Sequence, residues 1–380
     1  MRSVLLLLLT FNGIHAEEAT IESALARSGS NRGRIETALR RVPDAQKRGM
    51  EFMIRYMPER DLKSLSADFL LENVRLAYEV REKTPWGKAI PEEIFLNDVL
   101  PYANINEQRH PWRKDFMQRW MPVVKDCKTA SEAAQKLNAT VFGTLNIRYS
   151  TKRKKADQSP KESMASGLAS CTGLSIVLAD ACRSVGVPAR LAGIPQWANK
   201  RGNHTWVEVW DKNWHFTGAA EPNGKGLNHT WFQGDAAQAK VESRMSAIYA
   251  ASYKQTGTSF PLIWAPGVDW VSAVNVTNRY TPDKLRNAGP RLMVRVWSHD
   301  RRQRVAAEVS VTTAKSDKRM TGTSRDEGFD TNDILAFGVK SNATYRVVVK
   351  HAGSTVSHEV RPGGRRQVIV DVVLPGVTAN

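Results

Sequence analysis

The spacing of apolar residues divides the chain into parts with different periodicity. Over residues 17–129, apolar positions recur at helical spacing, as in Gly49–Tyr56 and Asp68–Arg81, which predicts a helical N-terminal region. From residue 288 the pattern changes to alternating or β-branched runs separated by turn sequences, which predicts a β-sandwich accessory domain over 288–380. The predicted strands are Arg291–Trp297, Val305–Val311, Thr344–Lys350, Thr355–Val360 and Gln367–Val373.

A helix is predicted to begin at Cys171, in the middle part of the chain. Ser170 suits the N-cap position, apolar residues follow on one helical face, and Gly186 ends the pattern. A thiol at this position is favoured in its reactive thiolate form, because the first turn of a helix carries partial positive charge and unpaired N–H groups. The same N–H groups can hold an oxyanion.

A β-hairpin is predicted shortly after this helix. Residues 204–210 alternate in polarity as a strand does, Asp211-Lys212-Asn213 has turn chemistry, and a returning strand starts at Trp214. The strand opens with His204, so a nucleophile and its base can be assembled from the two elements. Further on, Met245–Tyr253 is predicted as a helix and Phe260–Asn275 as partly β structure.

The chain has three cysteines, and their spacing argues against disulfide or metal chemistry. Cys182 lies eleven residues after Cys171, so on one helix the two thiols stand about 16 Å apart. That separation excludes a disulfide while the helix exists, and Cys182 is interpreted as a small buried residue. No Cys-x-x-Cys or His-x-x-x-His pair is present to hold zinc, so neither a metal nor an organic cofactor is expected.

These residues resemble the core of the transglutaminase-like superfamily over roughly residues 130–235. The resemblance rests on Cys171 with Arg183, Gly186, Pro188 and Arg190 downstream, and on His204-x-Trp206-Val207-Glu208-Val209 with Trp214. It implies a papain-like α+β core, predicted here over 130–287, in which the Cys begins a helix packed on a sheet and the His opens the next strand. It also implies an acid on the strand that follows.

The acid is the point at which the sequence departs from the family pattern. The expected position, four residues after Trp214, is occupied by Gly218, and the nearest acid followed by proline is Glu221. A β-bulge at Gly218 would bring Glu221 opposite His204 on the same face of the hairpin. Glu221 is therefore predicted to orient His204, with Asp235 as an alternative that a fold-back would place there. No catalytic residue is predicted in the sandwich.

The resemblance implies acyl transfer at an amide through Cys171, His204 and an acid, in a protease, an amidase or a protein-cross-linking enzyme. A protein or peptide substrate follows from it. The alternative is a non-catalytic binding module on the same fold that holds cell-wall or polysaccharide surfaces, which the missing acid at Gly218 favours. Because no candidate acid, base or nucleophile lies in the sandwich, its removal is expected to leave the reactivity of Cys171 intact.

The first 16 residues and the overall charge indicate where the protein acts. Residues 1–16 are predicted to be a cleaved signal peptide, with Arg2 before a short apolar run that is too short to span a bilayer. This predicts a secreted or periplasmic protein that does not span the membrane. Lysine and arginine number 55 against 38 acids, a net charge of +17, which favours an anionic cell-surface polymer as partner. The basic residues are dispersed, so no nucleic-acid partner is expected.

Overall fold

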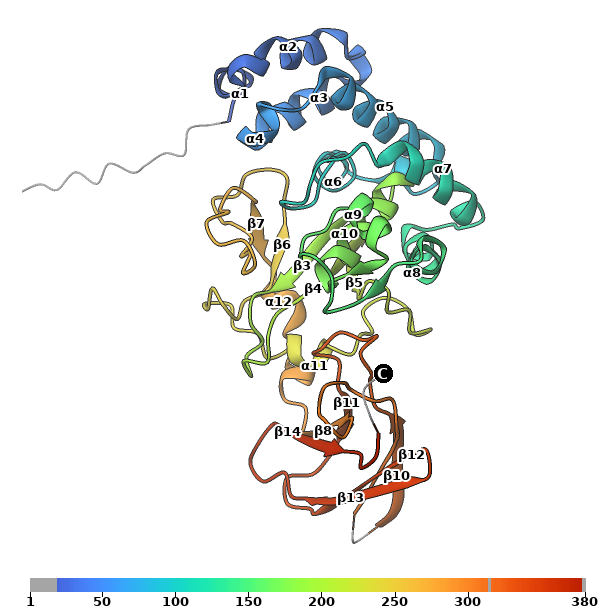
Figure 1. Ribbon diagram of the computed structural model, residues 1–380. Helices are drawn as coiled ribbons and strands as arrows, with labels where there is room; N and C mark the ends of the chain where they lie inside the picture. The colour runs from blue at the N-terminus through green and yellow to red at the C-terminus, as the bar shows by residue number, and fades with distance from the viewer. Residues whose placement is uncertain (1–18, 314–315, 378–380) are drawn as a thin grey trace, which may run out of the picture. The chain divides into compact units, whose positions relative to one another are not determined.

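The computed structural model describes residues 19–313 and 316–377 (Figure 1). The predicted signal peptide, residues 1–16, lies outside the described residues. The chain separates into two compact units, with the boundary between Leu71 and Glu72. Within the described part of the chain, no helix is both long and apolar enough to cross a membrane.

The first unit is helical, as the apolar spacing predicts. It contains α1 (Ile21–Arg27), α2 (Arg32–Arg41), α3 (Asp44–Tyr56), α4 (Glu59–Leu62) and the start of α5 (Ala67–Lys83). The predicted segments Gly49–Tyr56 and Asp68–Arg81 lie within α3 and α5. Asn31 joins two of these elements, because its buried side-chain amide donates to the carbonyls of Leu62 and Leu65.

The second unit starts with helices and continues into a five-stranded sheet. Its helices before the sheet are α6 (Glu92–Asp98), α7 (Arg113–Val124), α8 (Ala130–Leu145), α9 (Pro160–Ser166) and α10 (Cys171–Ser184). The sheet has the order β5-β4-β3-β6-β7, from β3 (Ala189–Ile194), β4 (His204–Asp211), β5 (Asn213–Thr217), β6 (Tyr249–Ala251) and β7 (Ala273–Asn275). All of its neighbouring strands are antiparallel. The short helices α11 (Gln233–Ala236), α12 (Thr277–Tyr280) and α13 (Asp283–Arg286) lie in its later connections.

Helix α10 is the central element of this core. It packs against α7, α8 and strands β3 and β4, and every residue from Thr172 to Ser184 is buried (Figure 1). A parallel two-stranded sheet, β1 (Arg148–Tyr149) with β2 (Leu168–Ala169), leads directly into the helix start. The helix ends before Gly186, whose φ of 77° is a conformation that favours glycine.

The predicted hairpin is present, and the predicted helix over Met245–Tyr253 is not. Trp210 pairs with Trp214 across a turn at Lys212, so the hairpin register is the one that the alternation indicates. Residues 249–251 instead form β6, which is hydrogen-bonded between β3 and β7 and completely buried. The helical prediction there was wrong because pairing with two distant strands overrides a short helical pattern.

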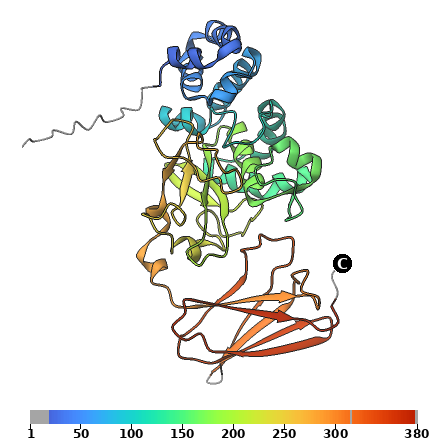
Figure 2. The same cartoon turned by 60° about the vertical axis from the view of Figure 1, so that its left-hand side comes forward.

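The C-terminal sandwich packs a four-stranded sheet against a three-stranded one (Figure 2). The first sheet has the order β10-β9-β12-β13, from β9 (Glu308–Thr313), β10 (Ser316–Thr323), β12 (Tyr345–His351) and β13 (Ser354–Val360). The second has the order β11-β8-β14, from β8 (Arg291–Trp297), β11 (Leu335–Gly338) and β14 (Gln367–Val373). Valines from both sheets, among them Val294, Val309 and Val347, fill the core between them. The α+β fold with a C-terminal sandwich is thus confirmed.

Candidate active site

Cys171 is the first residue of helix α10. The Ser170 side chain caps this helix by accepting the N–H of Gly173 at 3.0 Å. Cys171 is partly exposed, while the rest of its helix is buried. The thiol therefore stands at the end of a helix whose first N–H groups have no partner inside the helix, which favours negative charge at this point.

His204 is the first residue of β4 and lies next to this helix start. The hydroxyls of Thr172 and Thr205 are 3.0 Å apart, and Ser175 donates to the carbonyl of Thr205 at 3.2 Å. These contacts fix the start of α10 against the start of β4. The predicted pair of nucleophile and base is thus brought together by hydrogen bonds between neighbouring residues of the two elements.

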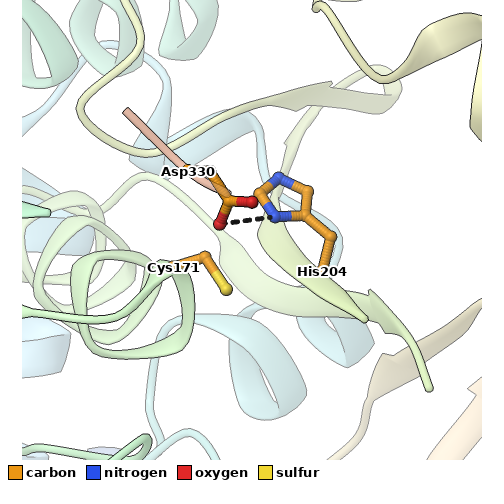
Figure 3. A group of neighbouring side chains, drawn as sticks. All are labelled: Cys171, His204 and Asp330. Carbon is orange, nitrogen blue, oxygen red and sulfur yellow. Dashed lines mark ion pairs between the residues drawn. The ribbon is translucent and has the colours of Figure 1, made fainter. Parts of the chain in front are cut away.

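The acid beside His204 is Asp330, from the loop between β10 and β11 of the sandwich. Its carboxylate is 3.5 Å from Nδ1 of His204, and both side chains are almost fully buried (Figure 3). At this distance the contact is an ion pair and not a full hydrogen bond. The Cys171 sulfur, a ring nitrogen of His204 and a carboxylate oxygen of Asp330 all lie within 4.8 Å of one another. The sandwich therefore places an acid beside His204, which the sequence did not predict.

The loop that carries Asp330 is held from several sides. The Arg304 side chain is buried and donates to four of its carbonyls, at 3.2 Å to Asp330, 3.1 Å to Asp333, 2.7 Å to Asp326 and 2.6 Å to Phe329. The Asn332 side chain donates to the carbonyl of Asn203, one residue before His204, at 2.9 Å. Because each of these bonds fixes backbone close to Asp330, the carboxylate has a defined position beside His204.

The electrostatics of the cluster favour a charged imidazole. Burial alone would lower the pKa of His204, but the Asp330 carboxylate and the Cys171 thiol outweigh it and hold this pKa well above its ordinary value. Burial would likewise raise the pKa of Asp330, yet the His204 charge and the Asn332 N–H keep it below its ordinary value. The arrangement thus stabilises an imidazolium between a carboxylate and a thiol.

Aromatic rings enclose the rest of the His204 ring. Trp197 and Trp206 stack on it at 6.1 and 5.9 Å between centroids, and Trp231 and Phe232 approach to 4.8 and 5.0 Å. This wall is fixed by Trp206, whose indole donates to the Tyr280 hydroxyl at 2.8 Å. The rings exclude water from one side of the imidazole, which strengthens its interaction with nearby charge.

Glu208 has a structural role. Its buried carboxylate accepts from Arg190 and from the Tyr280 hydroxyl at 2.8 Å each, and it pairs with Arg279. It thereby completes the chain of contacts that holds the wall around His204.

Glu221 lies in the same cleft, but its hydrogen bond goes to Trp231. The Trp231 indole donates to its carboxylate at 2.9 Å, and a Cβ at Gly218 would overlap this carboxylate. The pairing of β4 with β5 ends at Thr217, so the bulge that would have turned Glu221 toward His204 is not in the ladder. Burial raises the pKa of Glu221 to about 7. The structure thus pairs His204 with Asp330 and not with Glu221, the residue predicted to orient it.

The alternative acid and the other cysteines lie elsewhere. Asp235 is buried with Arg201 and Arg291, at 2.7 and 2.6 Å. Cys127 and Cys182 are free and buried, and burial raises the pKa of Cys182 to about 12. Cys171 is thus the most accessible of the three thiols.

The cluster opens on a cleft of about 400 Å³. Apolar side chains form much of its wall, and Arg148, Tyr149 and Glu221 add polar groups beside the cluster. The apolar lining residues are Phe142, Ile147, Leu174, Ala219, Ala220 and Phe329. A cleft of this volume, with an apolar wall and a few polar groups, is typical of a ligand-binding site.

The same three side chains could also hold a metal ion. A thiolate, an imidazole and a carboxylate are all zinc ligands, and here they converge within 4.8 Å. Neither ring nitrogen of His204 makes a full hydrogen bond within the described residues. The geometry therefore permits two kinds of chemistry, nucleophilic catalysis and metal binding, which experiments can separate.

One family model matches the segment that contains Cys171 and His204. Residues 118–233 match the family model of the transglutaminase-like superfamily. No curated protein matches the chain. Among solved structures, a candidate cysteine protease from Cytophaga hutchinsonii is 15% identical, with 43% of this chain and 58% of that chain covered and a TM-score of 0.26. A C-terminal fragment of the pilus adhesin SpaC from Lactobacillus rhamnosus GG is 9% identical, with coverage of 50% and 91% and a TM-score of 0.19. The chain thus spans little more than half of the first of these structures. Residues 118–233, which include Cys171 and His204, are similar to the transglutaminase-like superfamily.

Proposed function

We propose that this protein catalyses acyl transfer at amide bonds, with Cys171 as the nucleophile. The observation that carries the proposal is the position of the Cys171 thiol, at the start of a buried helix and beside the His204–Asp330 ion pair, in an accessible cleft. A thiolate paired with an imidazolium is the reactive form of a cysteine nucleophile.

The reaction follows from the charges in the cluster. The Cys171 thiolate attacks the carbonyl carbon of the amide, and the first N–H groups of α10 face the oxygen that becomes negative. The His204 imidazolium then gives its proton to the leaving amine as the C–N bond breaks, which leaves a thioester on Cys171. Asp330 keeps the imidazolium available for this step by stabilising its charge. None of these steps requires a metal or an organic cofactor.

The thioester is resolved by water or by an amine. Neutral His204 takes a proton from the incoming nucleophile, the C–S bond breaks, and the thiolate–imidazolium pair is restored. Water gives hydrolysis, as in a protease or an amidase, and an amine gives cross-linking. A protein or peptide is the proposed substrate, and the open cleft beside Cys171 supports this choice.

We also propose that the protein acts outside the cytoplasm, as a secreted or periplasmic protein. The leader pattern of residues 1–16 supports export, and the net charge of +17 supports contact with an anionic cell-surface polymer. Sequencing the N-terminus of the protein from fractionated native cells tests this. A mature protein that starts near Glu17 is expected, and recovery of Met1 from the cytoplasmic fraction contradicts export.

The acyl-transfer proposal is tested by thiol labelling and by a substrate screen. Iodoacetamide at about pH 6 should label Cys171 much faster than Cys127 or Cys182, as peptide mapping can show, because only a thiolate reacts under these conditions. A labelled-peptide screen should then give a product with wild type and none with Cys171→Ala. Equal labelling of the three thiols, with no product, would support the non-catalytic binding module.

A metal centre is the second candidate, and the convergence of three donor types favours it. The two candidates differ in their response to metal. If Cys171 is a nucleophile, Zn²⁺ binds its sulfur and inhibits the acyl-transfer activity, and a chelator leaves that activity unchanged. If the cluster is a metal centre, the purified protein contains near-stoichiometric metal, and chelation abolishes function.

A further inference from the structure

A tyrosine stands on the cleft wall next to the proposed nucleophile and has no part in the reaction described so far. Tyr149 is the second residue of β1, and it pairs with Ala169 of β2, two residues before Cys171. The N–H of Ser150 donates to the carbonyl of Ala169 at 2.9 Å, which extends this pairing. The strand therefore fixes Tyr149 relative to the start of α10.

The hydroxyl of Tyr149 is positioned from the opposite side by the sandwich. It accepts the backbone N–H of Thr331, the residue after Asp330, at 3.3 Å. Its ring packs half-buried against the hydrophobic core, and the side chain lines the same cleft as Cys171 and His204. A phenol that accepts one hydrogen bond still has its own O–H to donate.

The charges around this hydroxyl keep it protonated. Burial, followed by the negative charges of Asp330 and Cys171, raises the pKa of Tyr149 to about 12. The phenol is therefore a hydrogen-bond donor throughout the neutral range. The side chains of Tyr149, Cys171 and Asp330 line the same cleft.

The proposed reaction needs a hydrogen-bond donor beside the oxyanion that forms on the attacked carbon. The Asp330 carboxylate lies within 4.8 Å of the Cys171 sulfur, so a tetrahedral oxyanion formed on the attacked carbon develops near an existing negative charge. Helix N–H groups face the oxyanion from one side. A second donor that also separates the oxyanion from the carboxylate would offset the repulsion.

We propose that the Tyr149 hydroxyl is the side-chain donor that stabilises the oxyanion during attack by Cys171. This inference rests on the proposed acyl transfer and adds a catalytic residue to it. The donor comes from β1, and the carboxylate comes from the sandwich loop. The Thr331 N–H joins the two, because it binds the phenol oxygen as an acceptor and leaves the phenol O–H free to donate.

Two reactions of the same thiol test the proposal, because only one of them passes through an oxyanion. Iodoacetamide alkylates Cys171 at a saturated carbon, and p-nitrophenyl acetate acylates it through a tetrahedral oxyanion. In the full-length Tyr149→Phe variant, the ratio of the acylation rate to the alkylation rate should fall about 100-fold, as it does when one oxyanion donor is lost. The burst of p-nitrophenol measures the first rate, and mass spectrometry of the labelled protein measures the second.

Tyr345→Phe is the matched control, because that hydroxyl also accepts a backbone N–H, from Lys340 at 2.7 Å, within the sandwich. Its ratio of rates should equal that of wild type. A Tyr149→Phe ratio equal to wild type overturns the proposal, and so does an equal fall in both rates, which indicates a structural role. If wild type gives neither a burst nor fast alkylation, the acyl-transfer function itself fails, and this outcome is distinct from the other two.

Discussion

Replacing Asp330 with asparagine removes the negative charge beside His204 while keeping the size of the side chain. At 3.5 Å and an effective dielectric constant of about 20, the attraction between this carboxylate and the imidazolium is about 5 kcal/mol. The amide dipole and water recover part of this energy, and a net loss of about 3 kcal/mol corresponds to roughly 100-fold in the population of the charged pair, at about 1.4 kcal/mol per factor of ten. The pKa of His204 should fall accordingly, because the charge that raises it is removed.

The direction of the effect on reactivity follows from the sign of this shift. In the wild type, the pKa of His204 is raised, so the imidazolium persists through neutral pH. The proposed mechanism depends on this positive charge beside the Cys171 sulfur. In Asp330→Asn, the imidazolium loses its proton at lower pH, and the thiolate–imidazolium pair becomes a minor species. Alkylation of Cys171 by iodoacetamide at about pH 6 should therefore slow about 100-fold, and the rate should recover as the pH rises and the thiol ionises alone.

The measurement is the alkylation rate from about pH 5 to 9, for wild type, Asp330→Asn and a control. Asp283→Asn is suitable as the control, because Asp283 is exposed and its replacement also removes one negative charge. Thermal unfolding of each variant shows that the fold is retained. If Asp330→Asn kept the wild-type profile, Asp330 would not set the charge of His204, and the assignment of the site acid would be wrong.

Four further changes test other parts of the site. Arg304→Met removes the donors to four loop carbonyls and should slow alkylation of Cys171 toward the Asp330→Asn rate. Arg304→Lys should restore part of the rate. An unchanged rate in Arg304→Met would show that the position of Asp330 does not depend on the Arg304 hydrogen bonds. Deleting the C-terminal sandwich should abolish fast alkylation in a core that is still folded by circular dichroism, and a retained rate would contradict the role of Asp330. Gly218→Ala should lower the free energy of unfolding by about 1–3 kcal/mol, measured by urea denaturation, because its Cβ overlaps the Glu221 carboxylate. Zn²⁺ should inhibit and EDTA should not, and loss of activity on chelation would favour the metal centre.

The features predicted correctly from the sequence are those that neighbouring residues determine. Ser170 and Gly186 mark the ends of α10 through their own backbone preferences, and they place Cys171 at a helix start. The alternation from His204 to Trp210 determines a strand in the same way. Cys171 and His204 lie only 33 residues apart, on a helix and a strand that follow each other closely, so their proximity could be predicted from the chain.

The site acid could not be predicted on the same grounds. Asp330 reaches His204 through the folding of a separate sandwich and through bonds from Arg304 and Asn332, and none of these is a local signal. The sequence does carry a weak indication, since four acids lie within residues 326–333 between two strands of a strongly basic chain. The prediction of Glu221 followed from its nearness to the hairpin, and it required a bulge that the strand pairing does not contain.

The origin of Asp330 in a C-terminal sandwich has a consequence for the timing of synthesis. Asp330 is made 126 residues after His204, which at about 5–20 residues per second is a delay of roughly 6–25 s on the ribosome. During that interval the thiol and the imidazole have been made, but the carboxylate that charges the imidazole has not. If Cys171 is the nucleophile proposed above, its full reactivity is expected only after the last domain has been made and has folded onto the core.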